Sequence, residues 1–193
     1  MSNPLHVGVI WGSLRVESYN KKLALLVAAQ LERDHGVAID RIDLRELDLP
    51  MFSEDLESGG YPESVLDLKR RMIACDAILY VSPEYNGSLP GAMKNAIDWA
   101  SRPRAGEEVL ECFKGTVVGL LSASPGGLGG LRGLRHLRQI LTQVGSLVIP
   151  TEYALAKAGD AFDDEGWLKN EKSAQMAQDV GEEMVRIAKK LKD

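Results

Sequence analysis

Short apolar, β-branched runs alternate with longer amphipathic stretches along the whole chain. Runs of this length and composition predict buried strands, and their alternation with helices predicts a parallel sheet covered on both faces. The predicted strands are Leu5–Trp11, Val37–Leu44, Ala77–Ser82, Thr116–Ser122 and Leu147–Thr151. The predicted helices are Tyr19–Asp34, Glu63–Cys75, Pro90–Ser101, Leu131–Val144 and Asn170–Leu191. The pattern therefore repeats a strand–helix unit five times.

Five such units in 193 residues favour an open, doubly wound sheet over a TIM barrel, which needs about 250 residues. We expect an α/β fold of the flavodoxin-like type, with a five-stranded parallel sheet in the order 2-1-3-4-5. Residues 1–193 are expected to form a single domain. The segment Phe52–Pro62 is the longest polar connection before the C-terminal part, and it is either a functional, mobile loop or a solvated acidic one.

The charge balance limits the partners that this chain can take. It carries 23 basic and 28 acidic side chains, a net charge of −5, which is too acidic overall for a nucleic-acid binder. No basic leader precedes the first strand and no apolar run reaches the ~18 residues of a membrane span, so we expect a cytoplasmic protein without a membrane partner. Cys75 and Cys112 form no disulfide framework, and the apolar neighbours of Cys75 predict a buried, reduced thiol.

The predicted topology places a ligand site at one edge of the sheet. In open α/β sheets, ligands bind beyond the carboxyl ends of the strands, where the strand order reverses. For this strand order, the site lies in the loops that follow strands one, three and four. These three loops also have unusual compositions, rich in glycine, serine and proline.

The loop after strand one has the donors that a phosphate requires. The segment Gly12–Asn20 (GSLRVESYN) leads into a helix whose first N–H groups attract an anion. Arg15 adds a charged donor, and Ser13, Ser18 and Asn20 add neutral ones. The alternative is that Ser18 or Asn20 only caps the helix. No G-x-x-x-x-G-K-[ST] loop is present, and the run at 126–130 lacks the last glycine of G-x-G-x-x-G.

The loops after strands three and four can border a flat ring. The segment Pro83–Gly91 (PEYNGSLPG) predicts a rigid turn ahead of a helix, and a redox-active heteroaromatic ring needs such a stiff wall. Tyr85 and Asn86 are our candidates for that wall, the alternative being a purely structural turn. The segment Ser122–Gly127 (SASPGG) brings bare backbone to the same edge, unless it is only a flexible connector.

Three motifs in these loops resemble the NADPH-dependent FMN reductase family, which includes bacterial quinone, chromate and azo-dye reductases. The motifs are GSLR-x-x-S-x-N, PEYNGS-x-PG-x-x-KNAIDW and S-x-SPGG-x-GG-x-R, and Leu49–Glu57 and Phe162–Leu168 extend the resemblance over nearly the whole chain. The resemblance implies that FMN is held at its phosphate by the first loop and at its ribityl chain and ring by the other two. The implied cofactor-binding residues are Ser13, Arg15, Ser18, Tyr19, Asn20, Pro83, Glu84, Tyr85, Asn86, Gly87, Ser124, Gly126 and Gly127.

The same resemblance implies an oxidoreductase that works by a ping-pong cycle. NADPH or NADH gives a hydride to FMN, and the reduced flavin then reduces a small acceptor: a quinone, a free flavin, an azo compound or a chromate-like oxyanion. The flavin carries this chemistry, so we expect no catalytic acid–base residue. The family implies a homodimer or homotetramer. Many members carry an aromatic residue or histidine where this chain has Gly87, which leaves the acceptor preference open.

Two other classes of function compete with this one. A flavodoxin-like, FMN-binding electron carrier would share the fold but lack NAD(P)H activity, and the net charge of −5 gives it weak support. A serine hydrolase is disfavoured because the chain lacks a G-x-S-x-G elbow.

Several other polar or aromatic features of the sequence can be explained without a bound ligand. The basic helix with Arg132, Arg135, His136 and Arg138 is either a solvated face or a contact for a phosphate or a second subunit. The histidines and cysteines lack metal-ligand spacing, so we expect no metal site. The segment 160–166 is interpreted as an acidic turn instead of a calcium loop, and Trp99 as a packing or subunit-contact residue instead of a flavin contact.

Overall fold

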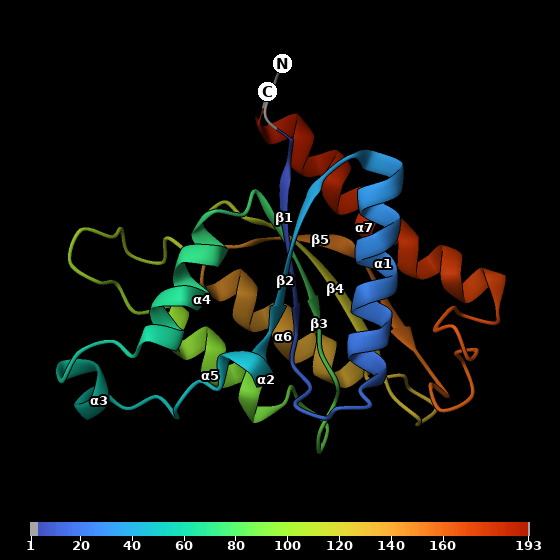
Figure 1. The fold of residues 1–193 in the computed structure, drawn as a ribbon, viewed down its shortest axis with the longest axis horizontal. Helices are drawn as coiled ribbons and strands as arrows, with labels where there is room; N and C mark the ends of the chain where they lie inside the picture. Colours follow the sequence, from blue (N-terminus) through green and yellow to red (C-terminus); the bar gives the residue numbers. More distant parts are fainter. Residues whose placement is uncertain (1–3, 193) are drawn as a thin grey trace.

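A computed structural model describes residues 4–192 and confirms the predicted α/β architecture. Its five strands form one parallel sheet in the order β2-β1-β3-β4-β5 (Figure 1). The strands are β1 His6–Trp11, β2 Ala38–Asp43, β3 Ala77–Val81, β4 Val117–Ala123 and β5 Leu147–Leu155. The strand order reverses between β1 and β3, so the edge predicted to bind a ligand lies at the carboxyl ends of these two neighbours.

Helices cover both faces of the sheet and divide the core in two (Figure 1). One layer contains α1 Tyr19–His35 and α7 Glu171–Lys192. The other contains α4 Glu63–Ile73, α5 Gly91–Ala100 and α6 Leu131–Gln143. The central strands β3 and β4 are buried at every position, because both faces of a parallel sheet pack against helices, whereas the edge strands β2 and β5 are partly exposed.

The first helix shows how local sequence signals set the element boundaries. Ser18 is the N-cap of α1, and its hydroxyl accepts a hydrogen bond from the Lys21 backbone N–H at 3.1 Å. Gly36 ends the helix in the left-handed conformation, with φ of 62°. The helix therefore begins at the carboxyl edge of the sheet and ends at the opposite edge.

The structure differs from the sequence prediction in three places. The polar loop at 52–62 contains a short helix, α3 Glu54–Ser58, and a second short helix, α2 Leu44–Leu47, follows β2. Strand β5 continues past Thr151 to Leu155, although it contains Pro150. Proline is tolerated there because β5 is an edge strand, and the register of β4 with β5 shifts between Val118 and Leu120.

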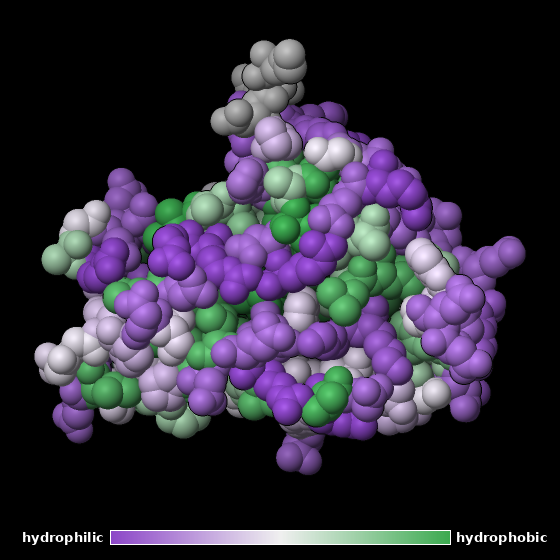
Figure 2. Space-filling model, in the orientation of Figure 1, coloured by the Kyte–Doolittle hydropathy of each residue, from purple (hydrophilic) through white to green (hydrophobic). Residues whose placement is uncertain are grey.

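The face of the protein shown in Figure 2 is mainly polar, with apolar patches between the charged groups. Within residues 4–192, no helix is both long and apolar enough to cross a bilayer. Both cysteines are free, but Cys75 is only partly buried, whereas Cys112 is fully buried. Cys75 is thus less buried than its apolar neighbours predicted, because the residue follows the last turn of α4 at the amino edge.

Candidate functional site at the carboxyl edge of the sheet

The loop after β1 packs directly on the loop that follows β3. The backbone N–H of Gly12 donates to the Val81 carbonyl at 3.0 Å, which continues the pairing of the two strands. A Cβ at Gly12 would lie 3.0 Å from Met93 Cε and 3.2 Å from Pro90 Cγ. Glycine therefore fits this position best, since a side chain would press on Met93 and Pro90 where the backbone of this loop lies close to the start of α5.

The start of α1 offers several unused hydrogen-bond donors. Ser13 and Ser18 are buried, and each hydroxyl accepts a backbone N–H, from Arg15 at 3.4 Å and from Lys21 at 3.1 Å. In the described chain neither hydroxyl donates to a protein acceptor, and the N–H groups of Tyr19 and Asn20 likewise have no partner. The capping interpretation is right for Ser18, but that bond uses only the oxygen's acceptor capacity.

Asn20 has a structural role that no local pattern indicated. Its Nδ2 donates to the Ala123 carbonyl and its Oδ1 accepts from the Ala123 N–H, both at 2.9 Å. The side chain is only 3% exposed. This pair of bonds fixes the start of α1 against the end of β4, so the first and third candidate loops lie side by side.

Arg15 is exposed and lies beside Tyr19. Its guanidinium carbon is 5.8 Å from the centroid of the Tyr19 ring, within the range of a cation–π contact. A Cβ at Gly159 would lie 3.6 Å from the Tyr19 hydroxyl, so Tyr19 also borders the loop after β5. No carboxylate of the described residues pairs with Arg15, which leaves its charge available for an anion.

The loop after β3 forms the rigid turn that its sequence predicts. The backbones of Tyr85 and Ser88 exchange two hydrogen bonds, at 2.9 and 3.1 Å. Asn86 and Gly87 between them have φ of 51° and 78°, the left-handed values of a type I′ turn. Tyr85 and Asn86 are exposed at its tip, and the segment after β3 projects beyond the sheet edge (Figure 1).

Glu84 joins this turn to α6. Its carboxylate accepts hydrogen bonds from the backbone N–H of Arg132 at 3.0 Å, from Arg132 Nε at 2.7 Å and from the Gly133 N–H at 3.3 Å. Its side chain is 7% exposed. Burial opposes ionisation of Glu84, but the bonds from Arg132 and Gly133 outweigh it and hold the pKa of the carboxyl below its usual value.

The glycines after β4 fall into two groups. Gly129 and Gly130 are packed, because a Cβ would lie 2.6 Å from the Ala154 carbonyl oxygen and 2.8 Å from Ser122 Oγ, respectively. Gly126 and Gly127 are exposed, with open space beside Gly127. Ser124 holds this open part, since its hydroxyl accepts the Gly126 N–H at 3.2 Å. Only the open pair can present bare backbone to a ligand.

The arginines of α6 form ion pairs instead of an open basic face. Arg132 pairs with Glu84 at 2.5 Å, while Arg135 and Arg138 both pair with Glu152 of β5, at 3.2 and 2.7 Å. Arg132 and Arg135 are nevertheless 63% and 62% exposed, so the solvated-face interpretation agrees with the structure, and the contact for a phosphate or a second subunit stays a prediction.

Trp99 and the acidic turn have structural roles. Trp99 is fully buried, its Nε1 donates to the Pro50 carbonyl at 2.7 Å, and its ring meets Phe52 edge to face at 5.0 Å. The packing interpretation is thus confirmed. Asp163 closes the turn at 160–166 by accepting the backbone N–H groups of Glu165 and Trp167. Residues 4–192 hold no cluster of three or more His, Cys, Asp or Glu side chains that could bind a metal ion.

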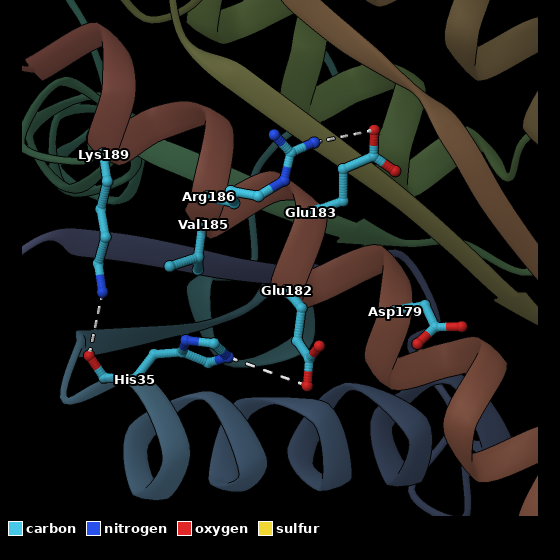
Figure 3. Close-up of a pocket in the computed structure, with 7 residues that line it drawn as sticks. All are labelled: His35, Asp179, Glu182, Glu183, Val185, Arg186 and Lys189. Carbon is cyan, nitrogen blue, oxygen red and sulfur yellow. Dashed lines mark hydrogen bonds and ion pairs between the residues drawn. The ribbon is translucent and has the colours of Figure 1, made fainter.

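A hollow of about 590 Å³ lies between α1 and α7, away from these loops (Figure 3). His35 lines it and points toward Glu182 of α7, with 4.0 Å between Nε2 and the carboxylate. His35 ends α1, so a helix of this length places it about 25 Å from the loop after β1. This hollow does not belong to the site at the carboxyl edge.

A second hollow, of about 400 Å³, borders the site and was not anticipated from the sequence. It lies between the loop after β1, the short helix α2 and the start of α5, and Leu14, Arg45, Met51 and Gly91 are among its lining residues. No sequence pattern indicated it, because α2 is a single turn without helical periodicity.

The residues at the carboxyl edge fit an elongated cofactor with a phosphate at one end and a flat ring at the other. Free hydroxyl and backbone donors surround the start of α1, with an unpaired guanidinium beside them. The turn that contains Tyr85 supplies a rigid wall for the ring. The open backbone of Gly126 and Gly127 supplies a second wall without side chains. These features come from the three loops that the topology singled out, and Asn20 and Glu84 connect them.

Comparison with known proteins agrees with this geometry. The model of the NADPH-dependent FMN reductase family matches residues 5–160. A quinone reductase of Pseudomonas putida is 36% identical over 172 residues, 88% of each chain, and an NAD(P)H-dependent FMN reductase of Pseudomonas aeruginosa is 38% identical over 180 residues, 92% of each chain. Among solved structures, the flavoenzyme NAD(P)H:(acceptor) oxidoreductase FerB of Paracoccus denitrificans matches with a TM-score of 0.81 and 34% identity, over 96% of this chain and 98% of that one. The chain therefore belongs to the NADPH-dependent FMN reductase family and is an FMN-dependent oxidoreductase that uses NAD(P)H.

Proposed function

We propose that this oxidoreductase uses a quinone as its electron acceptor. The observation that carries the proposal is the convergence of three loops, after β1, β3 and β4, on one edge of the sheet, with an exposed aromatic side chain, Tyr85, at that edge. A flat acceptor can stack there by the same contacts that a flat nicotinamide uses. The Pseudomonas putida relative, itself named a quinone reductase, supports this choice.

The loop after β1 is the proposed phosphate site. Ser13 and Ser18 would donate their free hydroxyl hydrogens, the backbone N–H groups of Tyr19 and Asn20 would point at the anion, and Arg15 would add the one charged contact. The proposed walls around the ribityl chain and the ring are Pro83, Glu84, Tyr85, Asn86 and Gly87 on one side and Ser124, Gly126 and Gly127 on the other.

When bound, FMN accepts a hydride from the reduced nicotinamide and passes the electrons on to the acceptor. The residues of the chain contribute by holding the reacting molecules in place. The type I′ turn at 85–88 keeps Tyr85 fixed, and the open space beside Gly127 leaves room for a flat molecule. Glu84 stays ionised and bound to Arg132, so it holds the turn in place and is not available to move a proton. We assign no catalytic acid or base.

NADPH oxidation tests this function against the electron-carrier alternative. Purified protein is mixed with FMN, its visible spectrum is recorded, and NADPH oxidation is followed with and without a soluble quinone. A quinone-dependent rate well above background supports the reductase. Flavin binding without any NADPH oxidation would support the electron-carrier alternative. If the protein takes up no flavin, both the reductase and the electron-carrier functions are overturned.

We also propose that the protein is a homodimer or homotetramer in the cytoplasm. A hollow of about 710 Å³ between α5 and α6 has apolar side chains, Leu89, Ile97 and Val144 among them, next to the turn at 85–88. A second copy covering it would remove that apolar surface from water. Two free cysteines fit a reducing compartment. Light scattering at micromolar concentration would give the mass, and a monomer would contradict the assembly.

A further inference from the structure

Arg15 and Arg45 differ from every other arginine in residues 4–192, because each of the others lies within 4.0 Å of a carboxylate oxygen. Both unpaired arginines follow neighbouring strands at the carboxyl edge. Arg15 is in the loop after β1, and Arg45 is in α2 directly after β2. The proposed phosphate site engages Arg15 and leaves Arg45 without a partner.

The carboxylate that caps α2 is not available to the guanidinium of Arg45. Asp43, two positions before Arg45, is only 5% exposed and is engaged twice. Asp43 binds Lys21 Nζ at 2.8 Å and caps α2 by accepting the Arg45 backbone N–H at 3.0 Å. The backbone of Arg45 is thereby fixed while its guanidinium stays free.

Arg45 lines the hollow of about 400 Å³ described above, together with several apolar side chains. Leu14 and Met51 are among these apolar side chains, and they are 50% and 75% exposed. Exposed apolar side chains beside a free guanidinium suit a ligand with a flat apolar body and a phosphate group. Leu14 lines the hollow and directly precedes Arg15, so the hollow borders the loop that contains the proposed phosphate site.

We infer that this hollow is the subsite for the adenosine end of the nicotinamide cofactor, with Arg45 as the residue that contacts its phosphate. The inference rests on the proposed function and extends it to a residue that determines cofactor affinity. Asp48 lines the same hollow and also has no ion-pair partner among the described residues, so its negative charge repels a phosphate. Binding of a phosphate in this hollow therefore depends on the positive charge of Arg45.

The test compares NADPH with NADH in the FMN-loaded protein. Arg45→Ala is expected to raise the KM for NADPH about ten- to hundredfold, the effect of losing one charge-assisted contact, with kcat within about twofold. Arg45→Lys should recover part of the affinity, and Asp48→Asn should lower the KM. If the KM for NADH is unchanged, Arg45 reads the 2′-phosphate, and if it rises equally, Arg45 contacts the pyrophosphate.

Calorimetric titration gives a second readout that does not depend on turnover. Adenosine 2′,5′-bisphosphate and ADP are titrated into the wild type and the Arg45→Ala variant. Arg41→Ala is the matched control, because Arg41 is also exposed but pairs with Glu32 on the far side of β2. Unchanged binding in Arg45→Ala, or an equal loss in Arg41→Ala, would overturn the inference.

The flavin content of each variant separates this inference from the proposed function. If the wild type takes up no FMN, the proposed function fails. If the wild type and Arg45→Ala take up FMN equally and bind both nucleotides equally, the subsite alone fails.

Discussion

Glu84 and Arg132 lock together two of the loops that form the candidate site. The carboxylate of Glu84, just after β3, accepts both a side-chain and a backbone hydrogen bond from Arg132, at the start of α6. A Cβ at Gly133 would lie 3.3 Å from the Glu84 Cα, so the backbones are also in close contact. The Glu84 side chain thus attaches the turn that contains Tyr85 to α6, although no backbone–backbone hydrogen bond joins the turn to this helix.

Glu84→Gln should destabilise the protein by about 1 to 3 kcal/mol at pH 7, because a buried charge-assisted network is lost. The pKa of Glu84 is lowered in the folded state, so its contribution is present above the unfolded pKa of about 4.5 and is lost as pH falls through the folded value. Denaturant unfolding of the wild type and the variant at pH 7 and at pH 3.5 measures the difference. Equal differences at both pH values would contradict the assignment, and Glu165→Gln, at an exposed turn, is the control.

Asn20→Ala should cost about 2 to 4 kcal/mol of folding stability. Two buried hydrogen bonds disappear, and the backbone N–H and carbonyl of Ala123 are left without partners. The variant should also bind FMN more weakly, since the start of α1 is no longer fixed against β4. Asn170→Ala removes only one exposed bond, to the Ser173 N–H, and should cost about 1 kcal/mol. A similar loss in both variants would argue against the special role of Asn20.

Arg15→Ala should weaken FMN retention by more than tenfold while leaving the melting temperature of the flavin-free protein within a few degrees. The guanidinium is exposed and has no carboxylate partner in the described chain, so its removal affects an anion more than the fold. Equilibrium dialysis against FMN gives the dissociation constant. Arg70→Ala removes a similarly exposed arginine far from the edge and should retain wild-type affinity. Normal flavin occupancy in Arg15→Ala would mean that the phosphate lies elsewhere.

Neither cysteine should react with a thiol reagent in the folded protein at pH 8. Burial raises the pKa of Cys75 to about 12 and that of Cys112 to about 11, so almost no thiolate is present. Ellman's reagent should detect both thiols only after unfolding, and rapid labelling of the native protein would contradict this.

The same shifts predict that stability falls as pH rises above about 9. The unfolded thiols ionise near that pH, while the folded ones remain protonated. Denaturant unfolding between pH 8 and pH 10 would show the loss, and a Cys75→Ala, Cys112→Ala double variant should show less of it.

The sequence by itself determined the five strands, the five longer helices, their order and the edge of the sheet that holds the candidate site, but not the short helices α2 and α3. These follow from short-range signals: apolar runs, the Gly36 stop, and the prolines and glycines of Pro83–Gly91 that predict a rigid turn. Handedness of the crossovers then leaves few topologies for five such units.

Only the tertiary structure decided how the loops are joined and which charges remain free. Asn20 meets Ala123 across 103 positions, and Glu84 meets Arg132 across 48, so no local pattern could reveal either pair. The same holds for Arg45, whose guanidinium has no carboxylate partner in residues 4–192 while the nearby Asp43 pairs with Lys21, a residue of another helix. Long-range packing assigns partners to polar groups, and a sequence pattern shows only that the groups are present.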